Sequence, residues 1–157
     1  MDETTKAVIE RITTRYPEPR LIPSGHQSNA FYDCSQLTPN ELARLAAEAI
    51  GDLPEDVFDV AVGLAYQGIL FASAIAGGRG VAILQADGKL SGASVAGKKV
   101  VVVDDITCSG HRLKQAAEVL RTAGATVVGF AVIVDRSDGV IGAAAAPLWS
   151  AFQTNML

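Results

Sequence analysis

The chain has 157 residues, a length that fits one domain with a sizeable core. Its 13 basic and 17 acidic residues give a net charge of −4, which argues against a protein built to coat nucleic acid. The apolar runs are cut by charges or glycines before they reach membrane-spanning length, and no stretch resembles a signal peptide. We therefore expect a cytoplasmic domain with no nucleic-acid or membrane partner. Its cysteines, Cys34 and Cys108, lack metal-ligand spacing and are expected to be free thiols.

The N-terminal segment predicts a helix followed by two short extended pieces. Apolar residues at helical spacing indicate an amphipathic helix over residues 2–16, which two prolines end. Residues 21–33 contain a Ser-Gly turn between extended pieces, with His26 expected to be solvated in the turn. Phe31 and Tyr32 follow; such rings can pack the segment onto a core or serve as a platform for a flat ligand.

The next segment predicts a helix, a strand, a second helix and a second strand. Thr38 supplies an N-cap and Glu41 closes a capping box, so a helix begins here. Residues 57–62 predict the first core strand, and residues 80–85 predict the next one. Between them the loop 63–68 carries glycines that let its backbone approach an anion, unless it is a purely structural strand-to-helix turn.

The clearest motif is the stretch KKVVVVDDITCSG at residues 98–110. Its four consecutive valines predict a central parallel strand that is buried on both faces. The strand ends in Asp104 and Asp105, at the point where ligands bind in open α/β sheets. These carboxylates can accept hydrogen bonds from ribose hydroxyls or face Mg²⁺, or they can merely cap the following helix.

The polar turn after the two acids suits the phosphate of a sugar phosphate. The hydroxyls of Thr107 and Ser109 and the backbone N–H groups of residues 108–110 can together hold a phosphate monoester. A helical pattern follows, and residues 126–134 predict another strand, which ends in Asp135 and Arg136; this pair can belong to a site or equally to a surface turn. Residues 147–152 predict a last strand that joins the N-terminal extended pieces as a small hood.

Residues 100–112 resemble the phosphoribosyl diphosphate (PRPP) signature of the type I phosphoribosyltransferases, in which a hydrophobic run leads to two acids and a Thr/Ser/Gly loop. Cys108 and Ser109 stand where that family usually has Thr or Ala, and Arg112 stands where it usually has a small hydroxylated residue, so its charge can serve a phosphate or face solvent. From about Leu21 onward the chain is similar to the orotate branch, and the loop 63–68 resembles its pyrophosphate loop.

The resemblance implies roles for several groups of residues. Asp104 and Asp105 are the implied catalytic residues and, through Mg²⁺ bound with PRPP, the implied metal contacts. The other implied contacts are Thr107, Cys108, Ser109, Gly110, His111 and Arg112 to phosphate, Ala65, Tyr66, Gln67 and Gly68 to pyrophosphate, and Phe31, Tyr32 and Arg136 to the base.

The chain departs from the orotate branch in its positive charges. The long, mobile, basic loop of that branch is replaced here by a short turn, in which Lys89 is the remaining cation. Gln67 and Pro23 stand where the branch commonly has lysine, and an amide can hydrogen-bond a diphosphate but cannot neutralise it. Most of the groups expected to neutralise a leaving pyrophosphate are therefore missing.

We expect an α/β domain over residues 1–157, with the type I phosphoribosyltransferase fold: a central, mostly parallel sheet flanked by helices. The core is expected over about 37–144, and a small hood over about 18–36 and 145–157. The expected activity is transfer of ribose 5-phosphate from PRPP, with Mg²⁺, to a nucleobase. Orotate is the first candidate, the product is a nucleoside monophosphate, and the resemblance implies a homodimer active in pyrimidine nucleotide synthesis.

Two alternatives remain open from the sequence. The chain can be a regulatory protein that binds PRPP or a nucleotide with little or no turnover. It can also be an unrelated Mg²⁺-dependent phosphohydrolase with Asp104 as nucleophile, but that chemistry normally needs an acid two residues later, where Ile106 stands.

Overall fold

The computed structural model describes residues 1–137 and 146–155. The elements in chain order are α1 (Glu3–Arg11), β1 (Thr13–Leu21), β2 (Gln27–Tyr32), the 3-10 helix η1 (Cys34–Gln36), α2 (Pro39–Ile50), β3 (Val60–Leu64), α3 (Gly68–Ala76), β4 (Gly80–Leu84), β5 (Leu90–Gly92), β6 (Lys99–Thr107), α4 (His111–Thr122), β7 (Thr126–Asp135) and β8 (Leu148–Gln153). Within the described ranges, none of the helices has the length and hydrophobicity that crossing a bilayer requires.

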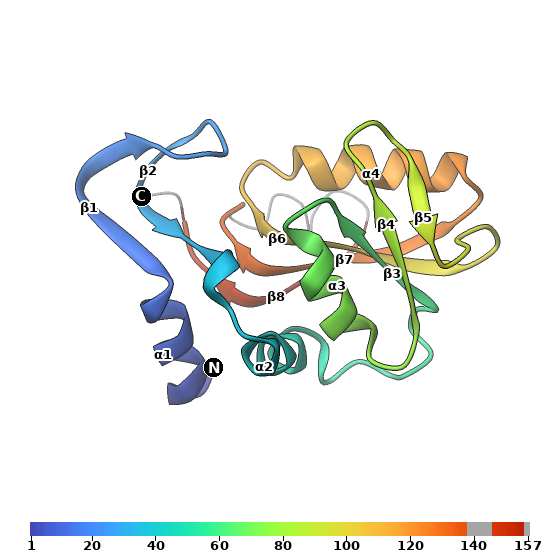
Figure 1. Cartoon of the computed structure of the whole chain (residues 1–157), viewed down its shortest axis with the longest axis horizontal. Coiled ribbons are helices and arrows are strands. Elements are labelled where there is room, and N and C mark those ends of the chain that lie inside the picture. The colour runs from blue at the N-terminus through green and yellow to red at the C-terminus, as the bar shows by residue number, and fades with distance from the viewer. Residues whose placement is uncertain (138–145, 156–157) are drawn as a thin grey trace.

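Six strands form the main sheet, in the order β5-β4-β3-β6-β7-β8 (Figure 1). All neighbouring pairs are parallel except β4 and β5, which are antiparallel at one edge. This arrangement confirms the predicted mostly parallel sheet. Because parallel strands end at the same edge, the carboxyl ends of β3, β6 and β7 lie side by side there.

The valine run forms the inner strand β6 and separates two apolar clusters. Val100, Val101, Val102 and Val103 have no exposed surface. Val101 and Val103 pack on one face with residues of α2 and α3, whereas Val100 and Val102 pack on the other face with residues of α4. Alternate side chains of a strand point to opposite faces, so a strand covered on both sides needs an apolar residue at every position. Each buried valine contributes roughly 1.5–3 kcal/mol.

The N-terminal helix is shorter than predicted, because α1 ends at Arg11 and does not continue to residue 16. The following residues form β1, which pairs with β2 as an antiparallel hairpin outside the main sheet. Two adjacent threonines begin β1, and β-branched residues favour an extended backbone. Pro17 and Pro19 lie where the pairing with β2 is interrupted, so their missing N–H groups are not needed there.

The strand predicted over residues 147–152 is present as β8, but it pairs in parallel with β7 and not with the hairpin. This pairing satisfies the outer backbone edge of β7, a largely buried strand of ten residues. The hairpin packs against β8 through side chains, with the rings of Tyr32 and Phe152 5.8 Å apart. Residues 138–145 and 156–157 of the predicted core and hood lie outside the described residues.

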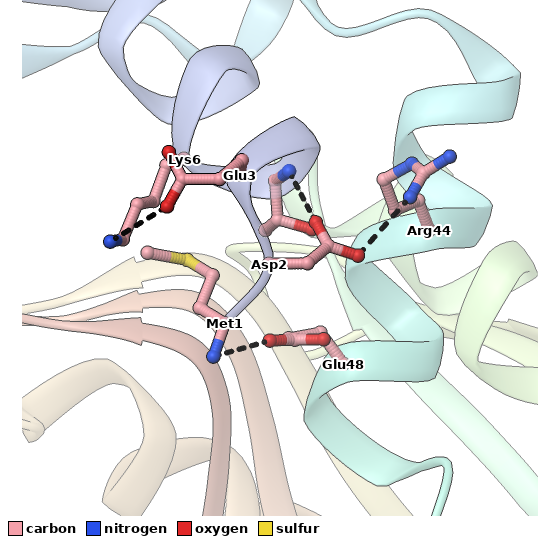
Figure 2. A network of polar contacts seen from close by, with 7 residues as sticks. Met1, Asp2, Glu3, Lys6, Arg44 and Glu48 are labelled. Carbon is pink, nitrogen blue, oxygen red and sulfur yellow. Dashed lines mark hydrogen bonds and ion pairs between the residues drawn. The ribbon is translucent and has the colours of Figure 1, made fainter.

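Helix α1 is held against α2 by a polar network at its N-terminus (Figure 2). Asp2 caps the helix by accepting from Thr5 N at 2.8 Å, and its other carboxylate oxygen lies 3.5 Å from Arg44. The Met1 nitrogen lies 3.3 Å from Glu48 Oε1. Exposed ion pairs contribute little free energy each. The helix therefore depends mainly on its buried apolar residues, Val8 and Ile9, and on the adjacent Ile12.

Candidate functional site

A pocket of about 560 Å³ opens at the carboxyl edge of the main sheet. Its walls come from segments that are far apart in the sequence. They include parts of residues 22–35 in the hairpin and the turn after it, the continuous stretch 104–113, and the single residues Gln67 and Arg136. The predicted acid pair, phosphate loop and aromatic residues therefore surround one cavity.

The acid pair lies at the end of β6. Asp104 is almost fully buried, and Asp105 is half-buried beside it. Burial, together with the charge of Asp105, raises the pKa of Asp104 to about 7. The nearby Arg112 guanidinium acts in the opposite direction but does not offset burial, because it is half exposed and 3.5 Å away. Near neutral pH, a bound cation or hydroxyl donors would therefore draw Asp104 into its ionised form.

A magnesium ion fits these carboxylates only as part of a complex with a phosphorylated ligand. Within the described residues, no cluster of three or more His, Cys, Asp or Glu side chains is placed to hold a metal ion. Magnesium commonly binds through one or two carboxylates together with phosphate oxygens and water. Asp104 and Asp105 supply such a partial set of ligands at the pocket wall.

The loop between β6 and α4 forms a cup of polar groups. Thr107 ends the strand and is buried, and Gly110 precedes the helix with a φ of +81°. This left-handed backbone favours glycine over residues with a side chain. No side chain caps the start of α4, although His111 N makes a long hydrogen bond of 3.3 Å to Ser109 Oγ. The first N–H groups of α4 thus lie at the pocket without a side-chain cap, an arrangement that suits an anion.

The loop between β3 and α3 passes close to the end of β6. Gly68 begins α3 so near to this strand that a Cβ atom would overlap the carbonyl oxygen of Val103. Glycine is therefore required for the helix to start beside the acid pair. Gln67 lines the pocket, and Tyr66 is 85% exposed. The peptide bond between Ala65 and Tyr66 is cis.

Arg112 lies in the first turn of α4, but its side chain contacts groups outside the phosphate loop. Its Nε atom is 3.5 Å from Asp104 Oδ2, and its Nη2 atom donates a hydrogen bond of 3.2 Å to the carbonyl oxygen of Ala65. One guanidinium group therefore connects the acid pair with the loop between β3 and α3.

All three residues assigned to the base by resemblance line the pocket, but they differ in how firmly other residues hold their side chains. Arg136 is almost fully buried and donates to the Ala30 carbonyl oxygen at 3.1 Å and to the carbonyl oxygen of Asn155. Its guanidinium carbon also lies 5.2 Å from the ring centre of Tyr32, which is itself buried. These two residues fix the hairpin to the sheet. Phe31 is half-buried and is the ring better placed to meet a flat ligand.

Other pocket residues were not predicted as parts of a site. The tip of the hairpin touches the phosphate loop, with Ser24 Oγ 3.8 Å from Cys108 Sγ and 3.1 Å from His26 Nδ1. His26 is thus a pocket residue and not simply a solvated turn residue. Asp33 and Cys34 also line the cavity, and burial together with the charge of Asp105 raises the pKa of the Cys34 thiol. The sequence does not predict these hairpin residues as parts of a site, because only the folded hairpin places them beside residues 104–108.

The predicted short turn at the position of the basic loop is confirmed as a hairpin between β4 and β5. The turn bonds to itself: Gln85 N donates to Lys89 O at 2.9 Å, and Lys89 N donates to Asp87 Oδ1 at 2.9 Å. Lys89 is not among the described residues that line the pocket. The structure therefore does not bring this cation to the predicted site.

Residues 77–142 match the family model of the phosphoribosyl transferase domain. The chain is 32% identical over 138 residues to the orotate phosphoribosyltransferase of Acinetobacter baylyi, covering 74% of this chain and 62% of that relative. It is 33% identical over 135 residues to the enzyme of the same name from Xanthomonas axonopodis pv. citri, covering 74% and 61%. The matched region thus spans about three fifths of these curated relatives.

Solved structures with the same fold extend the comparison to nearly the whole chain. A crystal structure of Mycobacterium tuberculosis orotate phosphoribosyltransferase in complex with PRPP has a TM-score of 0.75 at 22% identity, covering 96% of this chain and 94% of that one. The UMP synthase of Leishmania donovani has a TM-score of 0.79 at 27% identity, covering 96% of this chain and 36% of that one.

Proposed function

We propose that this chain, which belongs to the type I phosphoribosyltransferases and resembles their orotate branch, transfers ribose 5-phosphate from PRPP to a nucleobase, with orotate as the first candidate. One observation carries the proposal. An acid pair, of which Asp104 is buried and Asp105 half-buried, lies in the same pocket as the start of α4, which has no side-chain cap, and one strand carries the pair and leads into this helix. This combination offers acceptors to sugar hydroxyls and N–H donors to a phosphate within one cavity.

The pocket suggests how PRPP would be held. Its 5-phosphate would lie on the backbone N–H groups of residues 108–111, with the hydroxyls of Thr107 and Ser109. Its ribose hydroxyls would donate to Asp104 and Asp105, and its diphosphate would lie along the loop that contains Gln67. Magnesium bound with PRPP would neutralise part of the diphosphate charge.

The chemistry is a displacement at the anomeric carbon. A base nitrogen loses its proton to water and forms the new bond to this carbon as the bond to the pyrophosphate oxygen breaks, and the electron pair of that bond leaves with pyrophosphate. Positive charge develops on the ribose, and the carboxylates of Asp104 and Asp105 would stabilise it. Phe31 orients the base, so the protein contributes by positioning and electrostatics and supplies no nucleophile.

The test is release of pyrophosphate from PRPP and Mg²⁺ by the purified chain, with orotate, uracil, adenine and hypoxanthine offered separately. We expect release that depends on the base and is fastest with orotate. Chain with both Asp104→Asn and Asp105→Asn is the control for contaminating activity. The absence of release with every base would contradict the proposed activity.

A second function, binding of PRPP or a nucleotide for regulation, is favoured by one observation. The β4–β5 hairpin places Lys89 outside the pocket, so this segment supplies no charge to a leaving pyrophosphate. Saturable PRPP binding without pyrophosphate release would support this second function.

We also propose that the chain forms a homodimer. Two large apolar side chains remain exposed at the start of α3: Tyr66 at 85% and Leu70 at 67%. Tyr66 lies two residues before α3 and Leu70 lies in its first turn, so both offer apolar surface to a partner beside the start of this helix. Sedimentation equilibrium distinguishes a dimer from the 16.3 kDa chain, and a monomer at micromolar concentration would contradict this proposal.

A further inference from the structure

The position of Arg112 is unusual for a residue of a phosphate loop. Its backbone belongs to the first turn of α4, but its guanidinium lies between Asp104 Oδ2, at 3.5 Å, and the Ala65 carbonyl oxygen, at 3.2 Å. The side chain therefore points along the pocket wall, away from the proposed 5-phosphate cup and towards the loop proposed to hold the diphosphate.

The charges around the pocket make this position important. Among the described residues that line the cavity, the arginines are Arg112 and Arg136, and no lysine is present. Arg136 is 3% exposed and donates hydrogen bonds to the carbonyl oxygens of Ala30, in the hairpin, and of Asn155. The Arg112 side chain is 57% exposed and is held by two contacts longer than 3 Å. Arg112 is thus the lining arginine with freedom to meet a ligand.

We propose that Arg112 neutralises the diphosphate of bound PRPP, and that it leaves Asp104 in order to do so. The inference rests on the proposed function. A guanidinium forms two parallel, charge-assisted hydrogen bonds with a phosphate, which are stronger than its present contact with Asp104. On the same side of the pocket Gln67 offers an amide, which donates a hydrogen bond but carries no charge.

This movement of Arg112 between Asp104 and the diphosphate couples the acid pair to the loop proposed to hold the diphosphate. While the pocket is empty, Arg112 offsets part of the charge on the acid pair. When a diphosphate takes the guanidinium, Asp104 is released to accept the ribose hydroxyls or to face the magnesium ion of PRPP. When pyrophosphate departs, Arg112 returns to Asp104. A single side chain thus serves the acid pair and the leaving group in turn.

The test compares Arg112→Gln with Arg121→Gln by calorimetric titration of PRPP, pyrophosphate and ribose 5-phosphate, all with Mg²⁺. Arg121 is on the same helix, is exposed and pairs with Glu118, so its variant loses the same charge outside the pocket. We expect Arg112→Gln to lower the affinity for PRPP and for pyrophosphate at least about tenfold, which corresponds to the loss of one charged contact. Its affinity for ribose 5-phosphate should stay within about twofold of the wild-type value. Arg121→Gln should bind all three ligands like the wild type.

Two results would overturn the assignment. If Arg112→Gln binds PRPP as tightly as the wild type, Arg112 does not contact the diphosphate. If the variant loses equal affinity for PRPP and for ribose 5-phosphate, Arg112 contacts the 5-phosphate. Arg112→Lys, which keeps the charge, should retain more PRPP affinity than the glutamine variant. Wild-type chain that binds PRPP but releases no pyrophosphate with any base would end the proposed transferase activity and leave this inference standing; no PRPP binding at all would end both.

Discussion

Two parallel strands, β6 and β4, end in opposite ways at the same edge of the sheet. Strand β6 carries two carboxylates near its carboxyl end and is followed by a hydroxylated loop and a helix that begins without a side-chain cap. After β4 the chain turns back at once into β5, and the turn satisfies its own backbone groups. One strand end thus carries the groups that we propose hold a ribose phosphate, whereas the other contributes no described residue to the pocket. The difference teaches that the groups proposed to bind a sugar phosphate and the lysine left at the position of the basic loop are placed separately in this chain.

The largest expected effect comes from removing both charges at the end of β6. Asp104→Asn combined with Asp105→Asn should weaken PRPP at least about 100-fold, because two charged acceptors for the ribose hydroxyls and the metal are lost. Calorimetric titration with Mg²⁺ measures this loss, and circular dichroism checks that the fold is retained. Asp52→Asn with Asp56→Asn is the matched control, since both residues are exposed and outside the pocket. A double variant that keeps wild-type PRPP affinity would refute the site.

The buried carboxylate should also reduce stability at alkaline pH. Its pKa is about 7 in the folded chain and near 3.8 in the unfolded chain, so the folded chain holds the proton more tightly. The free energy of unfolding therefore falls as the pH rises from about 4 to about 7. Asp105, Arg112 and the Cys34 thiol face Asp104 and remain in the Asp104→Asn variant, in which residue 104 no longer titrates.

Asp104→Asn should accordingly be more stable than the wild type at pH 8, by roughly 2 kcal/mol or several degrees in melting temperature. At pH 5 the gain should be clearly smaller. Thermal unfolding of both proteins at the two pH values measures the difference. If the variant differs from the wild type by the same amount at both pH values, Asp104 does not titrate as described.

The next effect concerns the backbone of the phosphate loop. Gly110→Ala introduces a Cβ at a φ of +81°, which costs about 1 kcal/mol of strain and should distort the cup. PRPP and ribose 5-phosphate should both bind about tenfold more weakly. Gly97→Ala is the control, because its φ is +72° and its added Cβ meets nothing within 4 Å. Gly97→Ala should lower the free energy of unfolding but leave the affinity for both ligands unchanged. Equal losses of affinity in the two variants would count against a specific role of the phosphate loop.

A smaller effect is expected from adding charge where the loop after β3 lacks it. Gln67→Lys should raise the affinity for PRPP about fivefold, because the positive charge of a lysine at the pocket wall attracts the diphosphate. Ribose 5-phosphate, which has no diphosphate, should be unaffected. Titration of both ligands checks this, and an unchanged PRPP affinity would show that the diphosphate lies elsewhere.

The smallest effect is expected at the end of β4. Lys89→Ala should change PRPP affinity and pyrophosphate release less than about twofold, because this side chain does not line the pocket and surface charges act weakly at a distance. The same assays apply. A tenfold loss would show that the β4–β5 hairpin closes over the ligand after all, and the contrast between the two strand ends would fail.

Features encoded within a few neighbouring residues were predictable from the sequence. The buried strand follows from four adjacent valines, and the start of α2 follows from the Thr38 cap and Glu41, whose capping box is present. The acid pair and its polar loop were visible because they are contiguous. Each of these depends on local geometry that a short window of sequence determines.

Features that depend on distant contacts were not predictable. Residues 13–16 were predicted to be helical but belong to β1, because the backbone of this strand pairs with β2. Strand β8 joins the main sheet because it pairs with the otherwise open edge of β7. The direction of Arg112 depends on Asp104 and on Ala65, 47 residues earlier in the chain. Cys34 reaches the pocket only because the hairpin folds over the end of β6.

The most direct test of the account is a crystal structure of the chain with Mg²⁺ and PRPP. It should show the 5-phosphate on the N–H groups at the start of α4, the ribose hydroxyls on Asp104 and Asp105, and the Arg112 guanidinium on the diphosphate. Ligand bound outside this pocket would contradict the proposed site. A diphosphate contacted by Lys89, with Arg112 still on Asp104, would contradict the division of roles between the two strand ends.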